Sequence, residues 1–224
     1  MIRLQNWSVT YPDGTKAVDC LTFSAEKGGR IALIGGNGAG KSTLIRSMAG
    51  ILPGEGEAVL AGIPVEKKRF GELRRKTGVV FQNPDDQLFL PRIRDNVEFG
   101  LKNAGAGAQE TAARTEKILT LLNIAELGDR LSMKLSGGEK RLAALASVLV
   151  MDPEVLLLDE PTAFLDPKAR RNLIRILNRL PQTMLIATHD LAFAAEVCPR
   201  ALLLSRGMLV MDTSTEDINE DLIS

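Results

Sequence analysis

The sequence predicts one α/β domain whose core is a mixed β-sheet, with an antiparallel hairpin region at its N-terminal end and an inserted helical subdomain. An apolar run at residues 31–34 is followed by a glycine-rich turn and then a helical pattern. Apolar runs at residues 155–158 and 183–187 predict further strands of the same core. From about residue 91 to 135 the pattern changes to helical periodicity. We therefore expect a core and a helical subdomain, formed respectively by about residues 1–84 with 151–224 and by about residues 85–150.

The composition is that of an ordinary globular protein, with 45% hydrophobic and 25% charged residues in a chain of 224. The 28 basic and 28 acidic residues cancel, so no global basic surface favours nucleic acid, and we expect no nucleic-acid partner. Cys20 and Cys198 lack metal-ligand spacing, which predicts two buried or inert thiols in a reducing compartment. Residues 1–6 lack the apolar core of a signal peptide, and the longest mostly apolar run, residues 142–151, is too short to cross a bilayer. We expect a cytosolic protein that does not itself cross the membrane.

The N-terminal segment alternates apolar and polar residues, turns at Pro12-Asp13-Gly14 and continues into a second apolar segment at residues 17–23. This pattern predicts a small antiparallel hairpin. Tyr11, the only tyrosine in the chain, lies at the rim of the turn. Its ring could stack on a nucleotide base, and a tyrosine that merely packs in the fold is an equal alternative.

The glycine-rich turn matches a phosphate-binding loop, in which two glycines separated by four residues are followed by Lys and Ser. Glycines leave room for a phosphate, and the backbone N–H groups and the dipole of the following helix attract a polyanion. Ser42 would supply a hydroxyl to Mg²⁺. A glycine-rich turn that binds nothing is the alternative, and the complete consensus argues against it. The predicted nucleotide-binding residues are Gly35, Gly36, Asn37, Gly38, Ala39, Gly40, Lys41, Ser42 and Thr43.

Beyond the loop, a helix continues through residues 44–48 and is expected to end at Gly50, and residues 56–60 predict a short strand. The densest basic patch lies at residues 67–69 and 74–76 and has a single aromatic neighbour. We therefore expect a solvated helical face there.

Residues 135–139 open the next predicted helix, and Ser136 with Glu139 matches a capping box. A cap does not explain Gly137 and Gly138 in the first turn, where each glycine costs roughly 1 kcal/mol relative to alanine. Bare amides at a helix N-terminus predict a second anion site. Because this site belongs to the helical insert, a phosphate of a neighbouring molecule would reach it more easily than the chain's own.

Polar side chains stand where three predicted strands end. Gln82 follows the strand at residues 78–81, Asp159 and Glu160 follow a buried strand, and His189 closes another. Asp159 is placed to orient Mg²⁺, and Glu160 could accept the proton of an attacking water. Taken singly, a solvated strand end and a structural histidine are the ordinary alternatives, and Gln82 alone is weak evidence. The phosphate loop upstream favours the catalytic interpretation.

With these pieces in this order, the chain resembles the ATP-binding-cassette (ABC) ATPases from Tyr11 through His189. Residues 135–139 are what separate that family from other phosphate-loop proteins. The resemblance implies the phosphate-loop NTPase fold of the ABC ATPases and two nucleotide domains that face each other head to tail. Each ATP with its Mg²⁺ then lies between the phosphate loop of one subunit and Ser136-Gly137-Gly138 of the other.

The resemblance also implies roles for single residues. Glu160, His189 and Gln82 are the implied catalytic residues, with Glu160 as the general base and His189 as a contact to the γ-phosphate. The other implied roles are Tyr11 as the adenine platform, Gly36 to Gly40 and Lys41 as phosphate ligands, Ser42 and Gln82 at the Mg²⁺, Asp159 as support for the metal, and residues 163–166 as the loop between subunits. Phe164 departs from the pattern, because relatives more often carry a small residue there.

A finer resemblance rests on residues 81–89, Phe-Gln-Asn-Pro-Asp-Asp-Gln-Leu-Phe. This run is similar to the ATPase subunits of energy-coupling-factor importers, above all those for cobalt or nickel. It implies a transmembrane coupling protein as partner, a second ATPase subunit of the same or a related chain, and a peripheral position on the cytoplasmic face of the membrane. Asp85 and Asp86 are then expected to receive basic side chains of the coupling protein.

Other functions stay open at this point. A vitamin importer, a soluble ABC ATPase without a transport role and a non-catalytic nucleotide sensor are the alternatives. Glu160 and His189 argue against the sensor, and residues 135–139 would have no purpose in a phosphate-loop kinase or GTPase.

Overall fold

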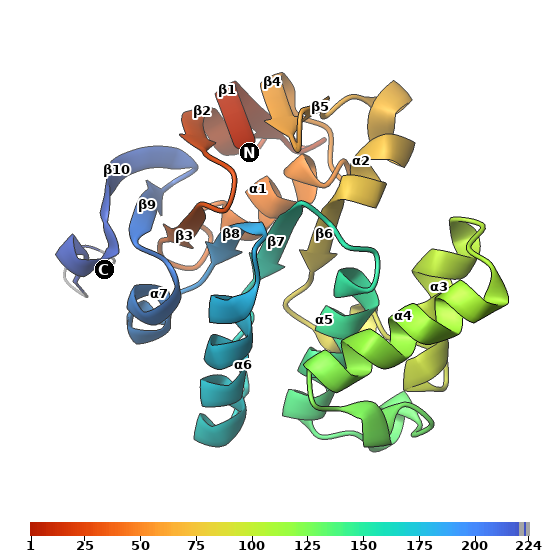
Figure 1. The fold of residues 1–224 in the computed structure, drawn as a ribbon. Coiled ribbons are helices and arrows are strands. Elements are labelled where there is room, and N and C mark those ends of the chain that lie inside the picture. Colours follow the sequence, from red (N-terminus) through yellow and green to blue (C-terminus); the bar gives the residue numbers. More distant parts are fainter. Residues whose placement is uncertain (220–221, 223–224) are drawn as a thin grey trace.

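The computed structural model describes residues 1–219 and 222, and its strands form two sheets (Figure 1). The antiparallel sheet has the order β2-β1-β4-β5 and contains β1 (Ile2–Thr10), β2 (Lys16–Ala25), β4 (Glu55–Leu60) and β5 (Ile63–Pro64). The larger sheet has the order β10-β9-β3-β8-β7-β6 and contains β3 (Arg30–Ile34), β6 (Thr77–Val80), β7 (Val155–Asp159), β8 (Thr183–Ala187), β9 (Arg200–Ser205) and β10 (Met208–Ser214). All neighbours in it pair in parallel except β10, which is antiparallel to β9. The predicted mixed sheet and N-terminal hairpin are confirmed.

Alternate residues of the central strands enter two different cores. In β3, Ile31 and Leu33 pack toward the antiparallel sheet and α1 (Lys41–Met48), whereas Ala32 and Ile34 pack toward the helices on the opposite face. Those helices include α6 (Pro167–Arg179) and α7 (Leu191–Val197). Because both faces of the sheet are covered, its strands are continuous apolar runs.

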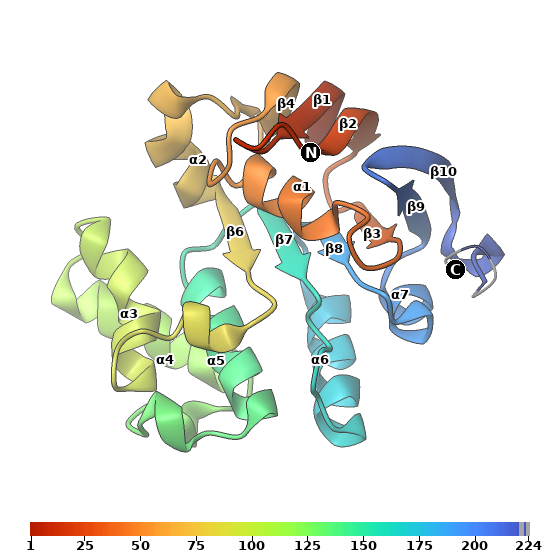
Figure 2. The same cartoon turned by 180° about the vertical axis from the view of Figure 1, so that it is seen from behind.

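The inserted helices form an arm beside β6 (Figure 2). The arm contains α3 (Ile93–Asn103), α4 (Ala108–Leu121) and α5 (Gly137–Leu149). The apolar run at residues 142–151 is mostly α5, which packs so closely on β6 that a Cβ at Gly78 would lie 2.1 Å from Val148 Cγ1. In the part of the chain that the structure describes, we find no helix long and apolar enough to span a membrane.

The basic patch lies on a short helical turn and α2 (Phe70–Lys76), and most of its side chains are exposed, as expected. The 3₁₀ turns are η1 (Lys67–Arg69), η2 (Pro84–Asp86), η3 (Ala125–Leu127), η4 (Ser132–Lys134) and η5 (Thr215–Asp217). Of the two thiols that we expected to be buried or inert, Cys198 is buried and Cys20 is exposed. Cys20 stands at a positive φ of 50°, and its N–H donates to Ser8 Oγ at an irregular point of the β1–β2 pairing.

Candidate active site

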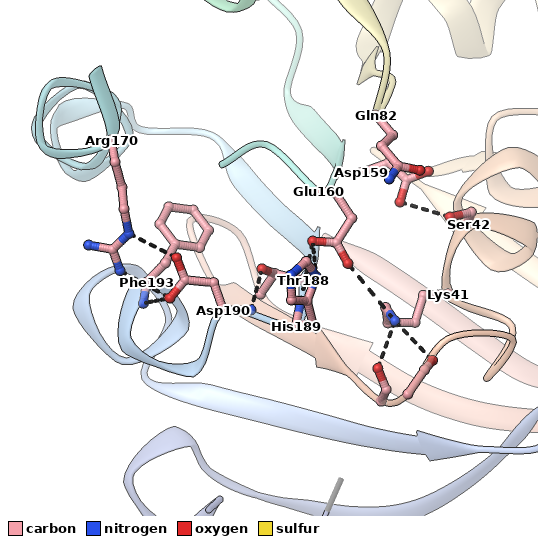
Figure 3. A network of polar contacts seen from close by, with 12 residues as sticks. Lys41, Ser42, Gln82, Asp159, Glu160, Arg170, Thr188, His189, Asp190 and Phe193 are labelled. Atoms are coloured by element: carbon pink, nitrogen blue, oxygen red, sulfur yellow. Dashed lines mark hydrogen bonds and ion pairs between the residues drawn. The ribbon is translucent and has the colours of Figure 1, made fainter. Parts of the chain in front are cut away.

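The predicted site residues that follow the parallel strands meet at one edge of the larger sheet. Because β3, β6, β7 and β8 are parallel, the segments that follow them leave the sheet on the same side. This edge brings together the glycine-rich loop after β3, Gln82 after β6, the carboxylates at the end of β7 and His189 after β8 (Figure 3). Residues more than a hundred positions apart in the sequence therefore face one another.

The loop of residues 35–40 ends at the N-terminus of α1 and is held tightly. Gly40 is the N-cap residue with φ 102°, and a Cβ there would lie 2.3 Å from Ala17 O. A side chain is thus excluded both by the left-handed backbone and by the neighbouring strand. No side chain caps α1, so its first N–H groups are left for an anion.

Lys41 lies inside this cradle. Its Nζ donates to Gly35 O at 2.7 Å and to Gly36 O at 3.2 Å, and it lies 4.0 Å from Glu160 Oε1. The Lys41 side chain is buried, with a relative exposure of 7%. A buried cation held by carbonyl oxygens can exchange them for phosphate oxygens, which bind a cation more strongly.

Oxygen donors suited to Mg²⁺ lie beside the loop. Ser42 Oγ donates to Asp159 Oδ1 at 3.0 Å, and Gln82 faces the same space. Burial raises the pKa of Asp159, and the hydrogen bond from Ser42 opposes this effect. No group of three or more His, Cys, Asp or Glu side chains gathers as a metal site within residues 1–219 and 222. This donor set fits Mg²⁺, which binds through one or two carboxylates and takes its other ligands from phosphates and water.

Glu160 contacts both the loop and His189. Its Oε2 lies 2.9 Å from His189 Nδ1, while its N–H donates to Ala187 O at 2.8 Å. The backbone at Glu160 has a positive φ of 46°, and its buried carboxylate lies 4.0 Å from Lys41 Nζ of the loop. A non-glycine residue in this conformation is strained, and such strain concentrates at functional sites.

A pocket of about 590 Å³ opens over the loop, large enough for a nucleotide. Tyr11 lines its rim, and Tyr11 Oη hydrogen-bonds Thr43 Oγ1 at 2.8 Å, so the ring is fixed next to the loop. Several lining residues were not expected from the sequence: Thr15, Lys16, Ala17, Arg206 and Gly207. Residues 15–17 could have been expected in the pocket, because they follow the hairpin turn beside Tyr11. No local sequence pattern indicated the turn between β9 and β10, which holds Arg206 and Gly207.

Ser136, Gly137 and Gly138 do not line this pocket. The predicted capping box is confirmed, because Ser136 Oγ accepts from Glu139 N and Glu139 Oε2 accepts from Ser136 N. The first turn of α5 therefore does not contribute to the chain's own pocket.

The segment after Gln82 is tied to α5. Lys140 Nζ donates to Asp85 Oδ1 at 2.7 Å, and Asn83 Nδ2 donates to Asp86 Oδ1 at 3.1 Å. Asp85, which we expected to receive a basic side chain of the coupling protein, therefore already pairs with a lysine of its own chain.

The strand–loop–helix cradle and the acidic strand end define a phosphate-loop nucleotide-binding protein. A family model described as ABC transporter matches residues 18–163. A putative ABC transporter ATP-binding protein of Streptomyces coelicolor is 48% identical over 212 residues, which cover 94% of this chain and 82% of the relative. The chain belongs to the ABC transporter family, and it is an ATPase of the kind that is coupled to transport.

Relatives whose names state a particular type of transporter are also similar over nearly the whole chain. The energy-coupling factor transporter ATP-binding protein EcfA of Methanoculleus marisnigri is 42% identical over 223 residues, covering 97% of this chain and 80% of the relative. The structure of cbiO1 from Clostridium perfringens, described as part of the ABC transporter complex cbiONQ, has 34% identity and a TM-score of 0.87, covering 96% of this chain and 89% of the other. The dimeric ATP-binding cassette MJ0796 bound to ADP and Pi has 25% identity and a TM-score of 0.87, covering 97% and 100%.

Proposed function

We propose that this chain is the ATP-hydrolysing subunit of an importer of the energy-coupling-factor type, peripheral to the cytoplasmic face of the membrane. The observation that carries the proposal is that the phosphate loop and Glu160 line one pocket, with Asp159 bonded to Ser42 and His189 in contact with Glu160 beside it. The similarity to EcfA supports the energy-coupling-factor type, and the similarity to cbiO1 supports a place in a transporter complex. The run at residues 81–89 is the basis for proposing cobalt or nickel as cargo, with a vitamin as the alternative.

The chain's own residues divide the work around a bound ATP. The loop amides of residues 35–40 and Lys41 hold the phosphates, and Tyr11 offers its ring to the adenine. Ser42, Asp159 and Gln82 would hold Mg²⁺, which when bound neutralises charge on the phosphate oxygens.

Glu160 is the proposed general base. Its buried carboxylate accepts the proton of the attacking water, while His189, on the solvent side of Glu160, donates to the γ-phosphate. A general base supplies about 10²- to 10⁴-fold in rate, or roughly 3 to 5 kcal/mol of barrier.

A second subunit completes the site. Ser136, Gly137 and Gly138 lie outside the chain's own pocket, and the similar cassette MJ0796 is described as dimeric. We propose that these amides bind the ATP held by a second copy or a related chain, so that ATP draws two subunits together and hydrolysis releases them. The helical insert of residues 85–150 is the proposed subdomain that carries these amides.

The transmembrane partner is proposed to meet the segment after Gln82. Asp86 is the better acceptor of its basic side chains, because a partner's cation would have to compete with Lys140 for Asp85. Charge reversal at Asp86 should abolish assembly with the membrane protein and leave ATP binding intact. Unchanged assembly would reject this contact.

Phosphate release by the purified protein tests the proposed site. Glu160→Gln should still bind ATP, lower turnover by at least about a hundredfold and accumulate a closed dimer. Lys41→Ala should weaken ATP binding itself. Glu57→Gln, an exposed carboxylate of β4, is the matched control and should behave as wild type. Normal turnover by the Glu160→Gln protein would contradict the assignment.

A further inference from the structure

The position of His189 depends on its backbone. Its side chain is 66% exposed, and the contact of Nδ1 with Glu160 is the one polar contact that its ring makes among the described residues. On the N-terminal side, Thr188 is fully buried and its N–H donates to Leu33 O at 3.1 Å, so β8 fixes the backbone there. On the C-terminal side, Asp190 lies beyond β8 and is the N-cap residue of α7.

We propose that Arg170 is a positioning residue, which holds His189 against Glu160 by gripping Asp190. This inference deepens the proposed function and rests on the roles given there to His189 and Glu160. Arg170 Nε donates to Asp190 Oδ2 at 2.8 Å, and Nη2 donates to Asp190 Oδ1 at 3.1 Å (Figure 3). Such a two-point pair fixes direction as well as distance.

Asp190 in turn hydrogen-bonds the backbone or side chain of residues on both sides of His189. Its Oδ1 accepts from Phe193 N at 2.8 Å and so caps α7, whose Phe193 side chain is fully buried. Its own N–H donates to Thr188 Oγ1 at 3.0 Å, across His189. Asp190 is thus bonded to the residue before His189, to the helix after it and to α6.

The cap alone would not hold His189 in place. Helix α7 has seven residues, and a helix so short depends on its packing and caps for its position. Burial by itself would raise the pKa of Asp190, but the Arg170 guanidinium and the Phe193 N–H outweigh it and leave the pKa lowered. Asp190 therefore stays ionised, and the pair with Arg170 keeps its charge at neutral pH.

The same contact ties His189 to the loop proposed to lie between subunits. Helix α6 begins after Asp166, which caps it by accepting from Lys168 N and Ala169 N, and Arg170 stands in its first turns. Phe164, in the loop just before, is 92% exposed. Movement of this loop on contact with a second subunit would reach His189 through Arg170 and Asp190.

A simple staple between α6 and α7 is the competing explanation. Arg170 Nη1 also donates to Glu196 Oε1 of α7 at 3.2 Å, and that contact lies away from His189. Glu196→Gln therefore weakens a bond to the same guanidinium without touching the Asp190 link. It is the matched control.

The test compares steady-state ATP hydrolysis, ATP affinity and thermal unfolding in the full chain. Arg170→Met, which keeps the packing of the stem, should lower kcat about ten- to a hundredfold and leave KM and ATP affinity within about twofold. Asp190→Asn should act in the same direction, and the double variant should be no slower than the slower single variant, because both break one link. Glu196→Gln should keep the wild-type kcat.

A cycle with His189→Ala separates positioning from general stability. In that background, Arg170→Met should cause no further loss of turnover, because there is no imidazole left to place. Wild-type kcat in Arg170→Met or Asp190→Asn, or an equal loss in Glu196→Gln, would overturn the proposal. Because Asp190→Asn breaks the link from the other side, the test stands even if one variant fails to fold. If wild type and Glu160→Gln turn over alike, the proposed function fails instead, whatever Arg170 does.

Discussion

Arg141 provides the sharpest test of how the helical arm is attached to the site. This α5 residue is 2% exposed, and its Nη1 and Nη2 donate to Phe81 O and Gln82 O, each at 2.6 Å. One buried guanidinium therefore joins α5, which Ser136 caps, to the segment after β6 that carries Gln82. We consider its replacement by methionine, which keeps the length of the stem and removes the donors.

The expected magnitude follows from two opposing effects. Two hydrogen bonds from a charged donor contribute about 1.5–3 kcal/mol each, or about 3–6 kcal/mol together. Burial lowers the pKa of Arg141, with Asp159 and Glu160 opposing the effect, and Nε finds no acceptor among the described residues. Removing this desolvated charge recovers a few kcal/mol. We therefore expect Arg141→Met to lower the free energy of unfolding by about 1–3 kcal/mol.

Urea unfolding of the wild-type and variant proteins measures this difference, and ATP hydrolysis measures its effect on the site. Turnover should fall more than ATP affinity, because the phosphate loop and Lys41 are untouched while Gln82 loses its tether. Arg141→Lys should fall in between, since one ammonium cannot span both carbonyls in the way a planar guanidinium does. An Arg141→Met protein with wild-type stability and turnover would refute the reasoning.

Three further outcomes follow from packing and ionisation. Gly78→Ala should lower the free energy of unfolding by about 1–3 kcal/mol, because the new Cβ would overlap a valine methyl of α5. Gly71→Ala should not destabilise the fold, because nothing lies within 4 Å of its added Cβ. Urea unfolding of both variants checks this pair. Burial raises the pKa of Cys198 to about 12, so a thiol reagent at about pH 8 should label Cys20 alone in the folded protein and both thiols after denaturation, as read by mass spectrometry. The pKa of Asp190 is lower in the folded protein than its value of about 3.9 in the unfolded chain. The ionised carboxylate therefore stabilises the fold above about pH 3.9, and this stabilisation is lost as the pH falls through the folded-state pKa. The destabilisation caused by Asp190→Asn should accordingly be full near neutral pH and shrink below about pH 4.

The sequence was sufficient where local patterns carry the chemistry. The phosphate loop, the capping box at Ser136 and the Asp166 cap with its following proline each depend on residues a few positions apart, and the structure contains all three. The apolar strands were also predictable, because burial on both faces leaves no alternation to misread.

Features made by long-range pairing were not predictable. Arg206 and Gly207 line the pocket because β9 pairs in parallel with β3, and Gly207 N donates to Ala39 O at 3.0 Å. No sequence pattern near Arg206 predicts that this turn lies beside the phosphate loop. The Asp85–Lys140 pair was missed for the same reason, since it joins positions 55 apart through the packing of η2 on α5.

Helix α5 connects the residues proposed to bind the second subunit's ATP with the segment that carries Gln82 of the chain's own site. Its N-cap residue is Ser136, which does not line the chain's own pocket, while Lys140 and Arg141 in its second turn hold the segment that contains Gln82. Under the proposed roles, one end of a single rigid helix meets the ATP of the second subunit and its next turn holds a ligand of the chain's own Mg²⁺. A displacement of α5 on dimer closure must therefore move Gln82, because the bonds from Arg141 are short and buried. Arg170 provides the corresponding connection from the loop before α6 to His189. Gln82 and His189 would then each be linked by one arginine to a segment proposed to meet the second subunit.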